Sequence, residues 1–452
     1  MSAALENTKP PRPLEGIRVF ELSIAIAGPV CGRYLAHFGA EVIKVESLKN
    51  PDVIRLLGSG WLARDRHGLQ AWGDCGPYVN EMMTGKRSLG LDLKSRAGLD
   101  AAKRLLEKCD VFISNYSAPA VVALGLDYES VRAVKPDIVY AGISGFGSDP
   151  IAPYYDFIAW GPNQGPLVGL DDLTGWPDRP PAGVVTIAYP DYTNGIHAAI
   201  AVLAALEHRD RSGEGQQIDM SQQEATVALF GSALLECELT QGAAPRRSGN
   251  RHSRAAPHGI YPCRGRERWV AISVFNDVEW RALCGVAKAP QWADDPRFRT
   301  LEDRLANADS LDEIIAAWTS GRFDTEVSEW LQRAGVAAAP VLDDPRVATD
   351  PQLEARGFWI LADHHHYRKD LATGNPIHLD DTPGFVERAG PSLGEDNDYA
   401  LGHVCGYSAP EIQRLVDCGA VFPMIADVRL ERPYLRWIRH FLPTLDWPET
   451  SK

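Results

Sequence analysis

The sequence has no apolar run long enough to cross a membrane as a helix, and it has no long basic stretch. Acidic residues outnumber basic ones by 60 to 46, which argues against nucleic acid or an anionic membrane as the main partner. The first residues, "MSAALENTKPPRPLEG", contain no apolar segment of the signal-peptide type. We therefore expect a cytoplasmic protein whose function resides in a site rather than in its bulk charge.

Metal and redox motifs are missing as well. The eight cysteines include no C-x-x-C pair, so neither a zinc site nor a disulfide framework is indicated, and we expect reduced thiols. We expect no metal at His364–His366, because consecutive side chains point to different faces; a solvated loop is predicted there. The segment "IAIAGP" (24–29) lacks the G-x-G-x-x-G spacing of a dinucleotide-binding turn.

What is present is an alternation of predicted strands and helices. "GIRVFELS" (16–23) predicts a strand, "AGPVCGRYLAHFG" (27–39) a helix and "AEVIKVES" (40–47) a second strand. The alternation continues through "DIVYAGISGFG" (137–147). This order predicts an α/β fold with a parallel sheet that is covered on both faces.

The second half of the chain has a different composition. Residues 242–258 are rich in Gly, Pro, Ser and Arg, which is typical of a linker or mobile loop. Residues 259–274 predict a hairpin whose turn is the charged "RGRER", and helical segments follow as far as "VAAAPVLD" (336–343). We expect a smaller α/β domain in this region.

One carboxylate, Asp191, lies in "YPDYTNG" (189–195), directly before a long apolar run. By default an aspartate in this place is a helix N-cap that accepts backbone N–H bonds, which would lower its pKa and keep it ionised. An ionised carboxylate among turn residues also meets the requirements of a nucleophile in covalent catalysis. The residues alone leave both interpretations open.

Several segments, in this order, resemble one known family. They are "PLEGIRVFELS", "LAHFGAEVIKVES", "GKRSLGLDLKS", "GLDYESVRAVKPDIVYAGISGFG", "YYDFIAW", the block "YPDYTNGIHAAIAVLAALEHRDRSGEGQQIDMS", "GIYPCRGRERWVAISVFNDVEW", "ADDPRF" and "DPQLEARGFW". Together they resemble the class III CoA-transferases, a family that includes formyl-CoA, carnitine and benzylsuccinate CoA-transferases and the α-methylacyl-CoA racemases. The resemblance runs from Leu14 to Glu395, and an ordered set is more specific than any single motif.

The resemblance implies a Rossmann-like large domain built from both ends of the chain, a smaller α/β domain, and an interlocked dimer. We expect either a homodimer or a heterodimer with a paralogous chain. The expected divisions are 1–225 (first part of the large CoA-binding domain), 226–258 (linker and mobile loop), 259–345 (small domain), 346–420 (return to the large domain) and 421–452 (C-terminal extension).

The resemblance also implies an activity. In the family the aspartate that matches Asp191 attacks an acyl-CoA thioester, and a mixed anhydride and then an aspartyl-CoA thioester form on it. Coenzyme A thioesters are therefore expected as substrates, with no permanently bound cofactor. Backbone N–H groups near the turn at 27–29 are expected to stabilise the oxyanion, and residues 242–258 are a candidate lid that excludes water.

The family's CoA contacts transfer to this sequence only in part. The expected contacts are Ala25, Ile26, Leu91, Asp92, Leu93, Lys94, Asn115, Tyr116, Ser117, Tyr155 and Asp156. Ser47 and Ala123 stand where relatives often have arginines for the nucleotide end of CoA, so two cationic contacts are missing. Lys44, Lys49 or a partner subunit is expected to compensate.

Two alternative functions remain beside the transferase. An acyl-CoA racemase would need a His before Asp156, where this chain has Tyr155. A mainly structural subunit of a hetero-oligomeric transferase would explain Ser47 and Ala123, but the retained Asp191 opposes it.

The substrates are indicated only in outline. Relatives often use succinyl-CoA as the donor. Trp160, Trp176 and Phe157, with Tyr155 nearby, suggest a pocket for an aromatic or branched acceptor acid.

Overall fold

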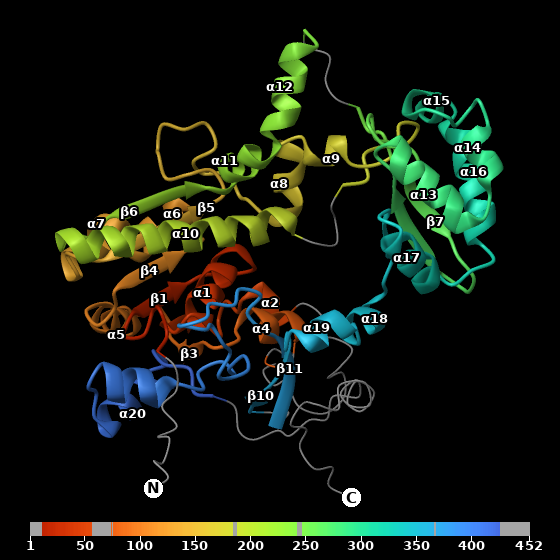
Figure 1. The fold of residues 1–452 in the computed structure, drawn as a ribbon. Coiled ribbons are helices and arrows are strands. Elements are labelled where there is room, and N and C mark those ends of the chain that lie inside the picture. Colours follow the sequence, from red (N-terminus) through yellow and green to blue (C-terminus); the bar gives the residue numbers. More distant parts are fainter. Residues whose placement is uncertain are drawn as a thin grey trace, which may run out of the picture. The chain divides into compact units, whose positions relative to one another are not determined.

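The computed structural model describes residues 11–56, 74, 76–183, 188–241, 246–365 and 368–424. They fall into two compact units, the larger within Met1–Leu170, Val184–Gly242 and Pro351–Lys452, the smaller within Asp171–Gly183 and Ala243–Asp350 (Figure 1). Most of the predicted C-terminal extension and part of the predicted loop lie outside the described residues. No helix in the described ranges is long and apolar enough to span a membrane.

A six-stranded sheet with the order β3-β2-β1-β4-β5-β6 forms the centre of the larger unit, and every neighbouring pair is parallel. The predicted parallel α/β sheet is therefore confirmed. Its strands are β1 (Arg18–Leu22), β2 (Glu41–Glu46), β3 (Arg87–Gly90), β4 (Val111–Ser114), β5 (Val139–Ser144) and β6 (Gln217–Ser221).

The larger unit also contains helices and one short hairpin. The helices are α1 (Ala27–His37), α2 (Val53–Leu56), α4 (Pro77–Met82), α5 (Arg96–Leu106), α6 (Ala118–Leu124), α7 (Tyr128–Val134), α8 (Gly161–Leu167), α10 (Tyr189–Ser212), α11 (Gln222–Val227), the 3-10 turn η1 (Ala228–Phe230), α12 (Gly231–Leu239), α19 (Pro351–Ala355), the π-helix η2 (Asp398–Val404) and α20 (Ala409–Asp417). All but the first residue of α9 (Leu170–Leu173) belong to the smaller unit. The hairpin pairs β10 (Trp359–His364) with β11 (Arg368–Thr373).

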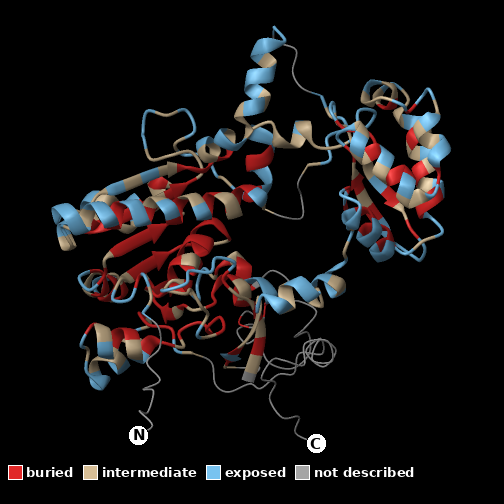
Figure 2. Ribbon diagram, viewed as in Figure 1, coloured by how far each residue is buried: buried red, intermediate tan, exposed pale blue. Residues whose placement is uncertain are grey.

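The central strands are apolar on both faces, because successive side chains point to opposite sides and both sides are covered. Val19 and Val111 belong to the core that contains residues of α1 and α10. Phe20, Phe112 and Tyr140 stack on the opposite face, with ring centroids 5.4 and 4.7 Å apart. Figure 2 shows these strands buried, whereas α12 is largely exposed.

Residues from the C-terminal part of the chain cover the free edge of β3. Backbone N–H groups of Ser88 and Gly90 donate to the side chains of Asp396 (3.0 Å) and Asn397 (2.9 Å). The N–H of Phe422 donates to the carbonyl of Gly90 at 3.0 Å. These bonds satisfy an edge that would otherwise be open to another strand.

A three-stranded antiparallel sheet, in the order β7-β8-β9, forms the centre of the smaller unit. The hairpin predicted at 259–274 is confirmed as β7 (His258–Pro262) and β8 (Trp269–Ser273), and β9 (Ala337–Pro340) completes the sheet. The helices of this unit are α13 (Asp277–Ala287), α14 (Pro290–Asp294), α15 (Leu301–Ala306), α16 (Ala308–Thr319), α17 (Asp324–Arg333) and α18 (Asp344–Ala348).

The described part of the predicted loop, 246–258, is anchored within the smaller unit. Arg247 pairs with Asp172 at 2.7 Å, and Arg251 pairs with Asp309 and with Asp312, the latter at 2.6 Å. A lid function for this segment stays a prediction.

A solvated loop was predicted at His364–His366. This prediction is wrong for His364, and His366 lies outside the described residues. His364 is the last residue of β10 and is buried, and its Nε2 lies 3.2 Å from Oδ1 of Asn80. Side-chain pairing with a helix of another segment, which the local sequence does not reveal, brings it into the interior.

Candidate active site

The order of the sheet strands points to a ligand site. Strand order reverses between β1 and β4, and in open α/β sheets ligands bind outside the carboxyl ends of the strands at such a point. The segments that leave β1 and β4 there are residues 23–26 and 115–117. Both segments contain residues that the sequence suggested as CoA contacts.

The turn after β1 is held in a strained conformation. Ala25 has a φ of 56°, in the left-handed region that costs an alanine about 1 kcal/mol. Its N–H donates to Oδ1 of Asp52 at 2.8 Å. The side chain of Asn115 accepts from the N–H of Ile24 at 2.8 Å and donates to the carbonyl of Ile24 at 2.7 Å. These three hydrogen bonds fix the turn.

Buried charges lie behind this turn. Nζ of Lys44 pairs with Asp52 at 2.8 Å and donates to the carbonyl of Ser23 at 2.7 Å. Burial opposes the charge of Lys44, but the carboxylates of Asp52 and Glu21 outweigh burial and raise its pKa. Lys86 pairs with Glu21 at 2.7 Å, yet burial lowers the pKa of Lys86 to about 8. The turn therefore rests on a rigid, internally paired set of charges.

Asp191 is the third residue of α10, not the residue before it. The interpretation as an N-cap is wrong: Ala188 takes that position, and none of the described side chains caps the helix. Pro190 explains the shift, because proline is accepted in the first turn of a helix and fixes a helical φ. None of the hydrogen bonds or ion pairs found among the described residues involves the Asp191 carboxylate, and 8% of the surface of this residue is exposed.

Burial therefore changes the acidity of Asp191 in the direction opposite to the one predicted. Loss of solvation raises its pKa from 3.8 to about 6, and no positive charge among the described residues offsets it. Two contacts hold α10 in place around it. A Cβ on Gly195 would lie 2.6 Å from the carbonyl of Ala27, so this glycine lets α10 pack closely on α1. Asn194 donates to the carbonyl of Gln222 and to Oγ1 of Thr226, both at 3.1 Å.

A cavity of about 320 Å³ contains Asp191. Its lining residues are Ile24, Ala25, Asn50, Asn115, Tyr116, Ser117, Ala120, Gly145, Phe157, Ile158, Ala159, Trp160, Gly161, Gln164, Asp191 and Gln222. Asp191 is the single acidic side chain in this set, and the set has no Lys, Arg or His. A Cβ on Gly161 would lie 2.3 Å from Oδ2 of Asp191, so this glycine leaves the carboxylate accessible.

The structure brings part of the predicted CoA contacts to this cavity. Ala25, Asn115, Tyr116 and Ser117 line it together with Asp191. The other predicted contacts lie elsewhere: Ile26 is in a neighbouring apolar cluster, and Leu91, Asp92, Leu93 and Lys94 follow β3. Their roles in binding CoA stay predictions.

Lys44 was expected to replace the positive charges that are missing at Ser47 and Ala123, but it cannot bind a phosphate. Its ammonium is fully buried and paired with Asp52. Lys49 is exposed, and its Nζ lies 2.6 Å from Asp92. A phosphate could reach Lys49 only by competing with this carboxylate.

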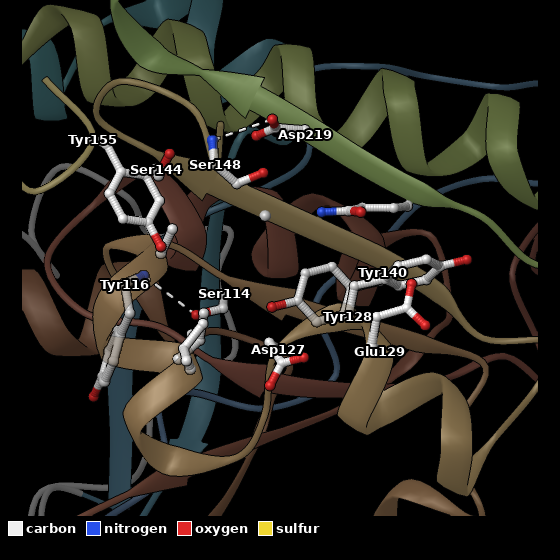
Figure 3. A pocket seen from close by; sticks show the side chains of 15 residues that line it. Ser114, Tyr116, Asp127, Tyr128, Glu129, Tyr140, Ser144, Ser148, Tyr155 and Asp219 are labelled. Atoms are coloured by element: carbon white, nitrogen blue, oxygen red, sulfur yellow. Dashed lines mark hydrogen bonds between the residues drawn. The ribbon is translucent and has the colours of Figure 1, made fainter. Parts of the chain in front are cut away.

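A second cavity, of about 260 Å³, lies over β5 and β6 and shares Tyr116 with the first (Figure 3). Tyr155 lines this second cavity, whereas Asp156 is exposed and lines neither. Three carboxylates, from Asp127, Glu129 and Asp219, lie in its lining, which contains no Lys, Arg or His. Their charge disfavours phosphate groups here.

Two glutamines of the first cavity, Gln164 and Gln222, were missed by the sequence reasoning. Gln222 directly follows β6 at the carboxyl edge of the sheet, which is a signal that could have identified it. Gln164 lies within α8, and no local pattern marks it. Trp160 and Phe157 line the cavity as suggested, but Trp176 belongs to the smaller unit.

Known proteins resemble this chain along most of its length. The sequence profile described as "CoA-transferase family III" matches residues 14–397. A succinyl-CoA–D-citramalate CoA-transferase from Chloroflexus aurantiacus is 32% identical over 91% of this chain and 98% of its own. A succinate–glutarate CoA-transferase from Agrobacterium fabrum is 34% identical over 88% of this chain and 96% of its own.

A solved structure shares the fold. The crystal structure of a CAIB/BAIF family protein from Brucella suis has a TM-score of 0.78 and 30% identity, and the match covers 88% of this chain and all of that one. The profile match and these relatives agree with the parallel α/β sheet of the larger unit. The chain belongs to CoA-transferase family III.

Proposed function

We propose that the protein transfers CoA from an acyl-CoA donor to a carboxylic acid through covalent intermediates on Asp191. The observation that carries this proposal is the state of the Asp191 carboxylate. It is buried, accepts no hydrogen bond from the described residues, and faces a cavity at the carboxyl edge of the sheet. A carboxylate with a purely structural role would be expected to accept hydrogen bonds.

In the first half of the proposed reaction, a carboxylate oxygen of Asp191 attacks the thioester carbonyl. A C–O bond forms, the C–S bond breaks, and CoA leaves as the thiolate. The thiolate then attacks the carbonyl carbon of Asp191, releases the donor acid and leaves an aspartyl-CoA thioester. The acceptor acid reverses these steps and departs as the new CoA thioester, so no net proton is needed.

The surroundings of Asp191 favour this chemistry. A carboxylate without hydrogen bonds has little solvation to lose when it attacks, and with a pKa of about 6 it is mostly ionised at neutral pH. The N–H groups of Ile24 and Ala25 are bound to Asn115 and Asp52, so we propose that the backbone N–H groups at the start of α1, which follows this turn, stabilise the oxyanion. Side chains of Phe157, Ile158 and Trp160 line the cavity and would limit the access of water to an anhydride.

Succinyl-CoA is the donor we propose, since the names of two relatives include succinyl-CoA or succinate. For the acceptor we propose an aromatic or branched acid, because Phe157, Ile158 and Trp160 give the cavity apolar walls. The names of these relatives also contain citramalate and glutarate, and we do not transfer these two acids to this chain.

We also propose that two copies of the chain associate as an interlocked dimer. Apolar residues three and four apart form an exposed stripe on α10, with Ile196, Ile200 and Leu203 between 42 and 59% exposed. On α12, Leu234 and Leu235 are about 60% exposed. Apolar patches of this kind mark association surfaces. Replacement of both leucines by Glu should shift the mass measured by light scattering from dimer to monomer; an unchanged mass would exclude α12 from the interface.

The catalytic proposal is tested by trapping the loaded enzyme. The purified protein is mixed with succinyl-CoA, quenched with hydroxylamine and digested, and the peptide containing Asp191 is weighed. We expect a hydroxamate at Asp191 in the native chain and none in Asp191→Ala. Asp210→Asn is the matched control, since Asp210 is an exposed carboxylate on the same helix.

The same experiment distinguishes the proposed catalytic role from the alternative, in which this chain is a mainly structural subunit. If the native chain stays unmodified while a co-purified paralogue becomes loaded, Asp191 is not the nucleophile and the proposal fails. Loading of Asp191 in a preparation that contains only this chain excludes the alternative.

A further inference from the structure

The side-chain amide of Gln164 is buried and has no hydrogen-bond partner within the part of the chain that the structure describes. Its exposed fraction is 1%, and neither Nε2 nor Oε1 has a hydrogen bond. Buried amides are normally paired, because an unpaired one loses its hydration and gains nothing. The amide of Gln164 does not cap α8. The neighbouring Asn163 does so, because its side chain accepts a hydrogen bond from the N–H of Trp160 at 2.7 Å.

Gln164 lies on the side of α8 that faces Asp191. Residues three apart share one side of a helix, and Gly161, three residues earlier, contacts the Asp191 carboxylate. A Cβ on Gly145 would lie 3.1 Å from Nε2 of Gln164, which places the amide at the carboxyl end of β5. Both Gln164 and Asp191 line the 320 Å³ cavity.

A second amide in the same cavity is also incompletely paired. Nε2 of Gln222 donates to the carbonyl of Ile143 at 3.2 Å, but its Oε1 has no partner. The two glutamines that line the cavity thus hold the unpaired N–H groups of one amide and the unpaired carbonyl oxygens of two; these atoms expose almost no surface, so a ligand would reach them once the side chains turn towards the cavity. Rotation of the Gln164 amide exchanges its ends but leaves one donor and one acceptor group.

The unpaired amide groups of Gln164 and Gln222 favour a ligand group that both donates and accepts hydrogen bonds. A carboxylate or a carbonyl can only accept hydrogen bonds, so it would leave the amide oxygens unpaired. A hydroxyl can accept from Nε2 and donate to an amide oxygen at the same time. An apolar hydrogen in its place would leave buried polar groups unsatisfied, which is the arrangement that discriminates most strongly between similar substrates.

We propose that Gln164, together with Gln222, determines specificity by binding a hydroxyl group on the acceptor, so that the protein prefers hydroxylated aromatic or branched acids over their deoxy analogues. This inference rests on the proposed function, because it assumes that the acceptor enters the cavity of Asp191. It adds a residue and a functional group that the transferase reaction itself does not require.

The test compares acceptor pairs that differ by one hydroxyl: phenyllactate against phenylpropanoate, and hydroxyisovalerate against isovalerate. Succinyl-CoA is the donor, and kcat/KM is measured for the native chain, for Gln164→Met, and for Gln413→Met as a matched surface control. In the native chain we expect a preference of about tenfold or more for the hydroxylated member of at least one pair, equal to about 1.4 kcal/mol. Gln164→Met should reduce this preference to within about twofold, whereas Gln413→Met should retain it.

Two further measurements distinguish a failure of the proposed function from a failure of the inference about Gln164. Loading of Asp191 by succinyl-CoA alone, measured in the native chain and in the surface control Gln413→Met, tests the proposed function separately, and we expect it in both. Methionine has nearly the volume of glutamine and loses no protein hydrogen bond, so the melting temperature should not fall. Loading without any preference within the pairs would overturn the inference, as would a loss of activity in Gln164→Met that is equal for both members of each pair.

Discussion

Replacement of Asp191 by Asn should stabilise the protein while it abolishes activity. The native carboxylate is ionised at neutral pH in a place where the charge is poorly solvated, and its pKa is raised from 3.8 to about 6. Asparagine has the same shape and no charge. The variant therefore removes the cost of burying the charge but keeps the packing around it.

The magnitude follows from the shift in pKa. A shift of one unit equals about 1.36 kcal/mol, so a rise from 3.8 to about 6 destabilises the native chain by about 3 kcal/mol once Asp191 is ionised. The folded state binds the proton more tightly than the unfolded state, so stability falls as pH rises between these two values. The advantage of Asp191→Asn should be near zero below about pH 4, grow towards about pH 6, and stay constant above it.

Thermal unfolding across this pH range measures the effect. The native chain, Asp191→Asn and the control Asp210→Asn are compared by calorimetry, with attention to the transition of the larger unit. We expect Asp191→Asn to melt several degrees higher at neutral pH and Asp210→Asn to match the native chain. The reasoning would be refuted by equal melting temperatures at about pH 8, or by a difference that persists at about pH 4.

Three other outcomes are expected. The rate of Asp191 loading by succinyl-CoA should fall about tenfold per unit below about pH 6, measured by quenched mass spectrometry, and a flat profile would contradict the raised pKa. Asn115→Ala removes both side-chain hydrogen bonds to Ile24, so we expect a loss of about 1 to 3 kcal/mol in unfolding free energy and slower loading of Asp191. Unchanged loading would mean that these hydrogen bonds to the turn do not matter for the reaction. Gly161→Ala places a methyl group 2.3 Å from Oδ2 of Asp191 and should prevent loading in a folded protein, whereas Gly231→Ala, with open space around it, should load normally.

The sequence was informative where a local pattern determines the structure. Buried strands such as β1 and β4 are short apolar segments between helices, and their alternation with helices admits few arrangements other than a parallel sheet. The hairpin of β7 and β8 was predictable because a charged turn separates two β-prone segments. The sheet in turn predicts where a ligand binds, since that follows from strand order.

The electrostatic state of the site could not be predicted in this way. Asp191 resembles an N-cap in sequence, and only the position of Pro190 in the first helical turn shows that α10 begins earlier. Its raised pKa depends on burial by distant segments, among them α8 and the turn after β1. The unpaired amide of Gln164 likewise exists only because tertiary packing leaves it without a partner.

The covering of β3 by Asp396 and Asn397 sets an order of events during translation. Asp396 lies 308 positions after its partner Ser88 in β3. Synthesis of this stretch takes roughly 15 to 60 seconds at a ribosomal rate of about 5 to 20 residues per second, and the edge of β3 stays uncovered during this time. The smaller unit is almost contiguous within Ala243–Asp350, so it leaves the ribosome complete while the central sheet still lacks its border. We expect the nascent chain in this interval to be a strong client for chaperones that bind unpaired strands.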